Sequence, residues 1–134
     1  LTKRLIQASE GDFRVLPVRQ FWGRATLSEA RLLGINPRQQ VYIREVALIC
    51  KGKPWVYARS IIPRSTMTGE ESQLKYLGSK PLGSLLFTHK NMQRGDIQIA
   101  PLHNHTAWAR RSLFYLSGKA LLVNEIFVSD MFKP

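Results

Sequence analysis

Runs of apolar and β-branched residues in the middle of the chain predict two paired strands. Residues 40–50 (QVYIREVALIC) and 54–62 (PWVYARSII) are rich in Val, Ile and Tyr, and they flank Lys51-Gly52. Two such runs on either side of a short turn that contains glycine are typical of a β-hairpin. Apolar residues occupy both faces of each run, so we expect both strands to be largely buried.

Four further segments have the composition of strands. They are residues 12–24, 92–100, 110–117 and 120–128, and the last two form a predicted hairpin that turns near Ser117-Gly118-Lys119. The first segment contains Pro17, which has no backbone N–H to donate. A proline inside a strand is typical of an edge strand or a bulge, so we expect one of these at residues 12–24.

The remaining segments predict short helices. Residues 26–40 are predicted to be a loop with one helical turn. The predicted helices are residues 69–77, capped by Thr66 or Thr68 and ended by Gly78, and residues 81–87, which begin at Pro81. Together these elements predict an α+β fold, in which a few helices pack on a single antiparallel β-sheet.

Length and composition are those of one folded domain over residues 1–134. Hydrophobic residues make up 44% of the chain and charged residues 22%, which is ordinary for a globular protein. No apolar run reaches the length of a membrane span, and the N-terminus lacks the layout of a secretory signal. The single cysteine, Cys50, excludes an internal disulfide and fits a reducing compartment. We therefore expect a cytoplasmic protein.

The chain is strongly basic, with a formal net charge of +11 from 20 Lys and Arg against 9 Asp and Glu. Such a charge favours an anionic partner, which can be a nucleic acid, an acidic membrane or a small acid. The densest clusters, Arg110-Arg111 and Lys51 with Lys53, do not alternate with aromatic residues as a single-strand binding surface does. Nucleic-acid binding predicts a steep dependence of affinity on salt, and the scattered distribution of the lysines argues against it.

Two arginines lie where strands are expected to be buried. If Lys51-Gly52 is a two-residue turn, Cys50 faces Lys53, and counting outward places Arg44 opposite Arg59. Two cations ~5 Å apart repel by roughly 3 kcal/mol at an effective dielectric constant of 20. Burial adds a desolvation cost to each cation that has no partner. The pattern therefore predicts a compensating anion between the two arginines.

Acidic residues in the sequence do not supply enough charge for this pair. Glu45 is expected to point to the opposite face, and Glu125 is the lone acid in the apolar run of residues 121–128. One buried glutamate cannot neutralise two buried arginines, so the surplus charge predicts a ligand carboxylate. The alternative is that both arginines extend to a sheet edge or pair with surface acids, and the spacing leaves these two interpretations about equal.

Metal and nucleophile signals are weaker. His103-x-His105 has no third ligand at a recognisable spacing, so a pair of surface histidines is the better interpretation. Cys50 at a strand end is expected to fill space in the core. No metal, flavin or nucleotide signature is present, and we expect any chemistry to come from placement and charge, without a cofactor.

Several short motifs occur in a fixed order between Val41 and Phe127. They are Arg44-Glu45; Gly52-x-Pro54-Trp55; Arg59 with Pro63-x-Ser65-Thr66; Leu77-Gly78-x-x-Pro81-Leu82-Gly83 leading to Leu86-Phe87-Thr88; Trp108-x-Arg110-Arg111-Ser112; Leu116-Ser117-Gly118-Lys119; and Leu121-Leu122 with Glu125-x-Phe127. This ordered set resembles the chorismate pyruvate-lyase family, and Leu1-Thr2-Lys3-Arg4 adds a thinner match.

The resemblance implies an α+β antiparallel-sheet enzyme that needs no cofactor and converts chorismate to 4-hydroxybenzoate and pyruvate, the entry to the ubiquinone ring. It implies that Arg44 holds the ring carboxylate, with backbone amides near Leu82 and Leu1. It places Glu125 against the oxygen that becomes the phenol, and Arg59 against the enolpyruvyl carboxylate. We expect a monomer that binds this small molecule and neither nucleic acid nor the membrane interior.

The chain departs from the family pattern at several places. Ala58 stands where a glycine is expected before Arg59, Leu1 replaces a methionine, and residues 96–107 match poorly. Family members carry helices before the Thr-Lys-Arg segment, and from the resemblance we expect this sequence to lack them.

The expected chemistry agrees with the residues, because chorismate carries two carboxylates and Glu125 can serve as a general acid. The alternative is a non-catalytic domain of the same fold that senses a small acid, as in some bacterial transcription regulators.

Overall fold

The structure is a computed structural model, and it describes residues 13–102 and 107–128. Within these residues one six-stranded sheet has the order β1-β2-β3-β6-β5-β4, and all neighbouring strands are antiparallel. The strands are β1 (Phe13–Arg24), β2 (Gln40–Cys50), β3 (Lys53–Pro63), β4 (Met92–Leu102), β5 (Ala107–Leu116) and β6 (Lys119–Phe127). The predicted α+β architecture is confirmed.

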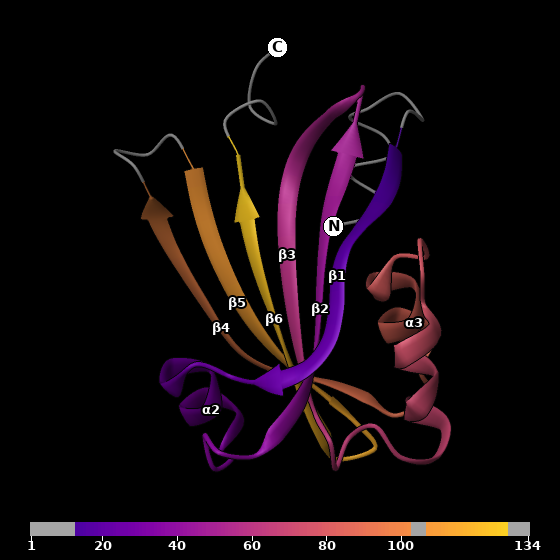
Figure 1. Cartoon of the computed structure of the whole chain (residues 1–134), viewed down its shortest axis with the longest axis vertical. Helices are drawn as coiled ribbons and strands as arrows, with labels where there is room; N and C mark the ends of the chain where they lie inside the picture. Colours follow the sequence, from indigo (N-terminus) through magenta and orange to yellow (C-terminus); the bar gives the residue numbers. More distant parts are fainter. Residues whose placement is uncertain (1–12, 103–106, 129–134) are drawn as a thin grey trace.

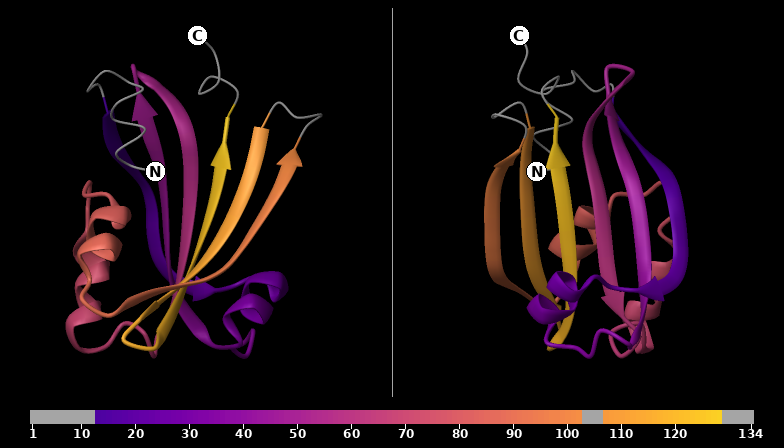
Figure 2. Two further views of the ribbon diagram at one scale, coloured as in Figure 1. Left: turned by 180° about the vertical axis from the view of Figure 1, so that it is seen from behind. Right: turned by 60° about the vertical axis from the view of Figure 1, so that its left-hand side comes forward.

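The helices pack on opposite faces of the sheet. They are α2 (Leu27–Leu33), the 3₁₀ helix η1 (Gly69–Tyr76) and α3 (Leu82–Thr88). Figures 1 and 2 show α2 on one face and α3 on the other, at the end where the strands converge. Two buried clusters lie beneath them, and Tyr42 and Ile62 belong to the α3 side whereas Ile43 and Ile61 belong to the α2 side. In the described part of the chain, no helix is long and apolar enough to cross a membrane.

Helix α2 is longer than the single turn that the sequence predicts. Thr26 caps it: the Thr26 hydroxyl accepts a hydrogen bond from the Glu29 backbone N–H (3.1 Å), and the Glu29 carboxylate accepts one from the Thr26 N–H (2.8 Å). This reciprocal capping box satisfies two N–H groups that a helix start leaves unpaired. Gly34 ends α2 with a left-handed φ of 71°. Helix α3 forms as predicted after Pro81, whereas the predicted helix at residues 69–77 is a 3₁₀ helix whose N-cap, Thr68, makes no capping hydrogen bond.

Both predicted hairpins form around two-residue turns with positive φ angles. Lys51 and Gly52 have φ values of 52° and 75°, and Ser117 and Gly118 have values of 51° and 78°. Positive φ at both central residues gives the turn the twist that two antiparallel strands require. Cys50 therefore faces Lys53, as predicted.

A bulge in the first hairpin changes the predicted register. Ile49 pairs with Pro54 but Leu48 pairs with Val56, so Trp55 is an extra residue on β3. Pro54 has no N–H for the ladder, which makes this position suited to a bulge. Each pair beyond it is displaced by one residue, and one residue moves a side chain to the other face of the sheet.

The prediction that Arg44 faces Arg59 is therefore wrong. Arg44 pairs with Ser60, and Arg59 pairs with Glu45. The two arginines lie on opposite faces of the sheet. A second bulge confirms the expectation for Pro17, because β1 is an edge strand and its register shifts between Pro17 and Arg19.

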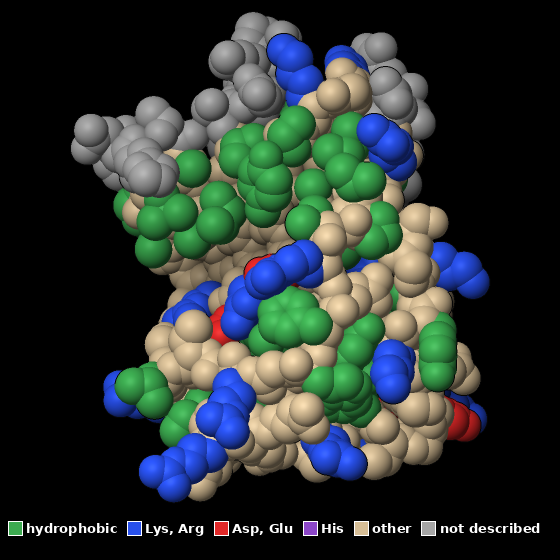
Figure 3. All heavy atoms as spheres, viewed as in Figure 1, with side chains coloured by type: hydrophobic (Ala, Val, Ile, Leu, Met, Phe, Trp, Pro, Cys, Tyr) green, Lys and Arg blue, Asp and Glu red, His purple; other side chains and the backbone are tan. Residues whose placement is uncertain are grey.

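Two acidic side chains pair with Arg59 on the α2 face. Its Nε donates to Glu29 Oε2 (3.0 Å), and its Nη1 donates to Glu45 Oε2 (3.2 Å). Arg19 Nε also donates to Glu45 (2.9 Å), and Asn124 donates to Glu29 (2.8 Å). In Figure 3, with α2 at the lower left, basic and acidic side chains are mixed across the middle of the molecule below an apolar band. This network ties α2 to the sheet.

Glu29 is the buried member of this network, with 3% of its surface exposed. Burial acts to raise its pKa, but hydrogen bonds from Arg59 and the Thr26 backbone outweigh burial, and the pKa is lowered. The pKa of Glu45 is also lowered, because hydrogen bonds from Arg19 and Arg59 outweigh burial. A carboxyl group whose pKa falls on folding stabilises the folded state above its unfolded pKa, and this stabilisation disappears as the pH falls through the folded value.

Glu29→Gln is expected to lower the free energy of unfolding at pH 7 by about 2 kcal/mol, because Arg59 loses its buried anion. The stability of the wild type is expected to fall as the pH drops below about 4.5, and the variant is expected to show a shallower fall. Urea denaturation at pH values from 7 to 3 measures the free energy of unfolding at pH 7 and its dependence on pH. Glu70→Gln, a change at an exposed acid, is the control. Equal acid sensitivity in Glu29→Gln and the wild type would contradict this account.

Candidate active site

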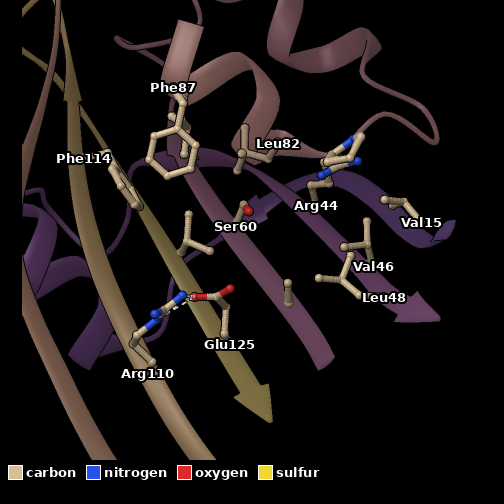
Figure 4. Close-up of a pocket in the computed structure, with 15 residues that line it drawn as sticks. Val15, Arg44, Val46, Leu48, Ser60, Leu82, Phe87, Arg110, Phe114 and Glu125 are labelled. Atoms are coloured by element: carbon tan, nitrogen blue, oxygen red, sulfur yellow. Dashed lines mark hydrogen bonds and ion pairs between the residues drawn. The ribbon is translucent and has the colours of Figure 1, made fainter. Parts of the chain in front are cut away.

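A cavity lies on the α3 face of the sheet, between the strands and the start of α3. Its charged lining residues are Arg44 on β2, Arg110 on β5 and Glu125 on β6. Figure 4 shows Arg44 at one end beside Leu82, the Arg110–Glu125 pair at the other end, and Ser60 between them. Phe87, Phe114 and Val46 contribute apolar walls. The cavity is thus an apolar chamber with charged groups at two ends, the form of a site for a small polar molecule.

Arg44 is buried without a counter-ion among the described residues. Only 2% of its surface is exposed, and burial lowers its pKa. Its Nη2 donates to the backbone carbonyls of Gly78 (3.0 Å) and Lys80 (2.9 Å), in the segment that leads to α3. Its Nε is buried and has no hydrogen-bond partner. A buried cation without a counter-ion is costly, and a carboxylate in the cavity would balance its charge.

The first residue of α3 stands next to this cation. Leu82 lines the cavity, and Pro81 before it fixes the start of the helix. The first N–H groups of a helix have no acceptor within the helix. The backbone of Leu82 can therefore add a donor near Arg44.

Arg110 and Glu125 form an ion pair at the other end of the cavity. They are direct neighbours across β5 and β6, and Arg110 Nε and Nη2 both donate to Glu125 Oε1, at 2.9 and 2.7 Å. Glu125 is 9% exposed. The Arg110 guanidinium also lies over the ring of Phe127, 5.2 Å from its centroid. Short bonds from a guanidinium to one carboxylate oxygen fix the position of Glu125.

The structure brings together three of the residues expected at the site. Arg44, Leu82 and Glu125 all line the cavity, and so does Ala58, where the family pattern has a glycine. Arg59 lies on the opposite face, paired with Glu29 and Glu45. Leu1, expected to contribute a backbone amide, lies outside the described residues, as do His103 and His105.

Sequence reasoning did not select Arg110, although a signal for it was present. Counting outward from the Ser117-Gly118 turn places Arg110 opposite Glu125, as the structure does. The pairing of a lone buried acid with a basic residue across a hairpin was therefore readable from the sequence.

Comparison with known proteins gives one family over the whole chain. Residues 1–134 match the family described as chorismate lyase. A Marinobacter nauticus protein named "Probable chorismate pyruvate-lyase" is 38% identical over 136 residues, which cover 98% of this chain and 72% of that protein. A Salmonella newport protein named "Chorismate pyruvate-lyase" is 38% identical over 129 residues, which cover 96% of this chain and 76% of that protein.

Solved structures with a similar fold include several that are named as transcriptional regulators. The C-terminal domain of PhnF superposes with a TM-score of 0.69 at 15% identity, over 87% of this chain and 83% of that domain. A GntR-family regulator from Bacillus cereus has a TM-score of 0.65 at 15% identity, over 92% of this chain and 96% of that chain. At this level of identity the likeness concerns the fold alone.

The burial of Arg44 without an anion predicts that this residue does not stabilise the fold. Arg44→Met is expected to leave the free energy of unfolding unchanged or to raise it by about 1 kcal/mol, because an uncompensated buried charge is replaced by an apolar chain. Arg59→Met, which leaves the buried Glu29 without its cation, is expected to lower it by about 2 kcal/mol or more. Urea denaturation without ligand compares the two variants. A loss in Arg44→Met as large as that in Arg59→Met would show that Arg44 is structural.

Proposed function

Because this chain belongs to the chorismate lyase family, we propose that it removes pyruvate from chorismate and leaves 4-hydroxybenzoate. The names of its relatives support a lyase that acts on a small molecule. The product is the aromatic acid from which the ubiquinone ring is built, and we place the reaction in the cytoplasm. The proposed reaction needs no cofactor.

One observation carries this proposal: a buried guanidinium without a counter-ion among the described residues lines a cavity that has a carboxylate at its far end. Arg44 binds the ring carboxylate, and the Leu82 N–H adds a second donor there. Glu125 lies against the ring hydroxyl that becomes the phenol. Val46, Leu86 and Phe114 supply apolar contacts for the ring between these ends.

The reaction requires orientation more than a reactive side chain. The ring carbon–oxygen bond to the enolpyruvyl group breaks, and its electron pair leaves with that oxygen. The neighbouring ring carbon, which bears the hydroxyl, loses its proton, and the ring becomes aromatic. The released enolpyruvate takes up a proton at its methylene carbon and becomes pyruvate. Holding both ends of the ring and balancing charge on the departing oxygen are the contributions expected of the protein.

Glu125 is proposed to act first as a hydrogen-bond acceptor. Its Oε1 accepts two hydrogen bonds from Arg110, and a carboxylate has a second oxygen that can also accept. It can therefore accept a bond from the ring hydroxyl and fix the ring in the cavity. A role as general acid requires a proton on the other oxygen, Oε2, because both bonds from Arg110 end on Oε1.

Incubation of the protein with chorismate is expected to release 4-hydroxybenzoate. The product is separated on a column and measured by its absorbance. Arg44→Met is expected to lower kcat/KM by about 100-fold or more, because a charge-assisted contact of about 3 kcal/mol is lost. Lys53→Met removes the same charge from an exposed position in the same hairpin and is expected to change kcat/KM little.

Two results would contradict the proposal. Binding of 4-hydroxybenzoate by the wild type without any turnover of chorismate would indicate a small-acid sensor of the same fold. Full activity in Arg44→Met would show that Arg44 does not bind the substrate.

A further inference from the structure

We propose that Arg110 is the second cation of the site and binds the enolpyruvyl carboxylate of the substrate. This inference rests on the proposed function and extends it. The substrate carries two carboxylates, and Arg44 can take only the one on the ring. Among the described residues that line the cavity, Arg110 is the other cation.

Arg59, which the family resemblance suggested for this role, is poorly placed for it. It lies on the opposite face of the sheet, because the bulge at Trp55 displaces the register of β3 by one residue. Its guanidinium already donates to Glu29 and Glu45. A substrate carboxylate would have to cross the sheet and displace two acids to reach it.

Arg110 has the geometry of a residue that can take a second carboxylate. Both of its hydrogen bonds to described residues end on one oxygen, Glu125 Oε1, through Nε and Nη2. A guanidinium has five N–H donors, so donors remain for another anion. Its side chain is 31% exposed, which places it nearer the solvent than Arg44. The contact with the Phe127 ring supports the guanidinium from one side.

The position of Arg110 also agrees with the geometry of the substrate. Glu125 is proposed to bind the ring hydroxyl, and the enolpyruvyl ether is attached to the neighbouring ring carbon. The enolpyruvyl carboxylate therefore lies near the group that Glu125 binds, where Arg110 is held. A cation there also balances the charge that develops as the carbon–oxygen bond breaks and the electron pair leaves with enolpyruvate.

Arg110 then distinguishes the substrate from the product. Chorismate has the second carboxylate and 4-hydroxybenzoate does not. Loss of Arg110 should weaken the binding of chorismate much more than the binding of 4-hydroxybenzoate. A residue that acted only by holding Glu125 in place would weaken both, because both molecules use Glu125.

The test compares Arg110→Met with the wild type in two backgrounds, with Glu125 present and with Glu125→Gln. The double variant removes both charges of the pair, so it leaves no unpaired ion in the cavity and keeps the test open if Arg110→Met alone does not fold. We expect Arg110→Met to raise the KM for chorismate about tenfold or more in both backgrounds, and to change the Kd for 4-hydroxybenzoate less than about threefold. Arg111→Met is the matched control, because Arg111 is adjacent on β5, faces the other side and contacts Asn124.

Each alternative result overturns a different claim. Equal weakening of both ligands, or no effect of Arg110→Met in the Glu125→Gln background, would mean that Arg110 only positions Glu125. An equal rise of KM in Arg111→Met would mean that net charge attracts the substrate, and this would also overturn the inference. Failure of the wild type to release 4-hydroxybenzoate would overturn the proposed function, and this inference with it.

Discussion

An arginine that is buried in a β-sheet needs an anion nearby. This requirement accounts for the partners of the arginines in this sheet. Arg59 has Glu29 and Glu45, and Arg110 has Glu125. Arg44, the most buried of the three, has only two backbone carbonyls and an unused Nε. Desolvation of an unpaired cation costs several kcal/mol, and Arg44 therefore lowers the stability of the folded state. Arg44 lies at an end of the cavity, where a carboxylate can enter.

One face of the sheet contributes mainly to stability, and the other face carries the proposed ligand site. On the α2 face, the acids around Arg59 fasten the helix to the strands. On the α3 face, the same central strands present Arg44 and Glu125 to a chamber with apolar walls. The bulge at Trp55 produces this division, because it moves Arg59 away from Arg44 and toward the acids. One extra residue in one strand thereby places Ser60, in place of a second cation, opposite Arg44.

The sequence was sufficient for most of the fold because turn chemistry and apolar runs are local. The pairs Lys51-Gly52 and Ser117-Gly118 adopt the positive φ angles that a short hairpin turn needs, and Pro17 lies on an edge strand with a bulge beside it. The faces on which Arg44 and Arg59 lie could not be predicted by counting residue pairs outward from the turn. Such counting assumes a regular ladder of pairs, and the bulge next to Pro54 interrupts it. The Thr26-x-x-Glu29 pattern of the capping box is local and was readable from the sequence, whereas the pairing of Glu29 with Arg59 depends on a contact distant in the sequence. Arg110 could have been found, because the second hairpin is regular.

The most direct test of this account is the binding of 4-hydroxybenzoate and of its neutral analogue 4-hydroxybenzamide, measured by calorimetry with the wild type and Arg44→Met. If Arg44 lacks an anion until a carboxylate arrives, the wild type binds the acid about tenfold or more tightly than the amide, and Arg44→Met binds the two with similar affinity. Equal binding of acid and amide by the wild type, or an undiminished preference for the acid in Arg44→Met, would contradict it.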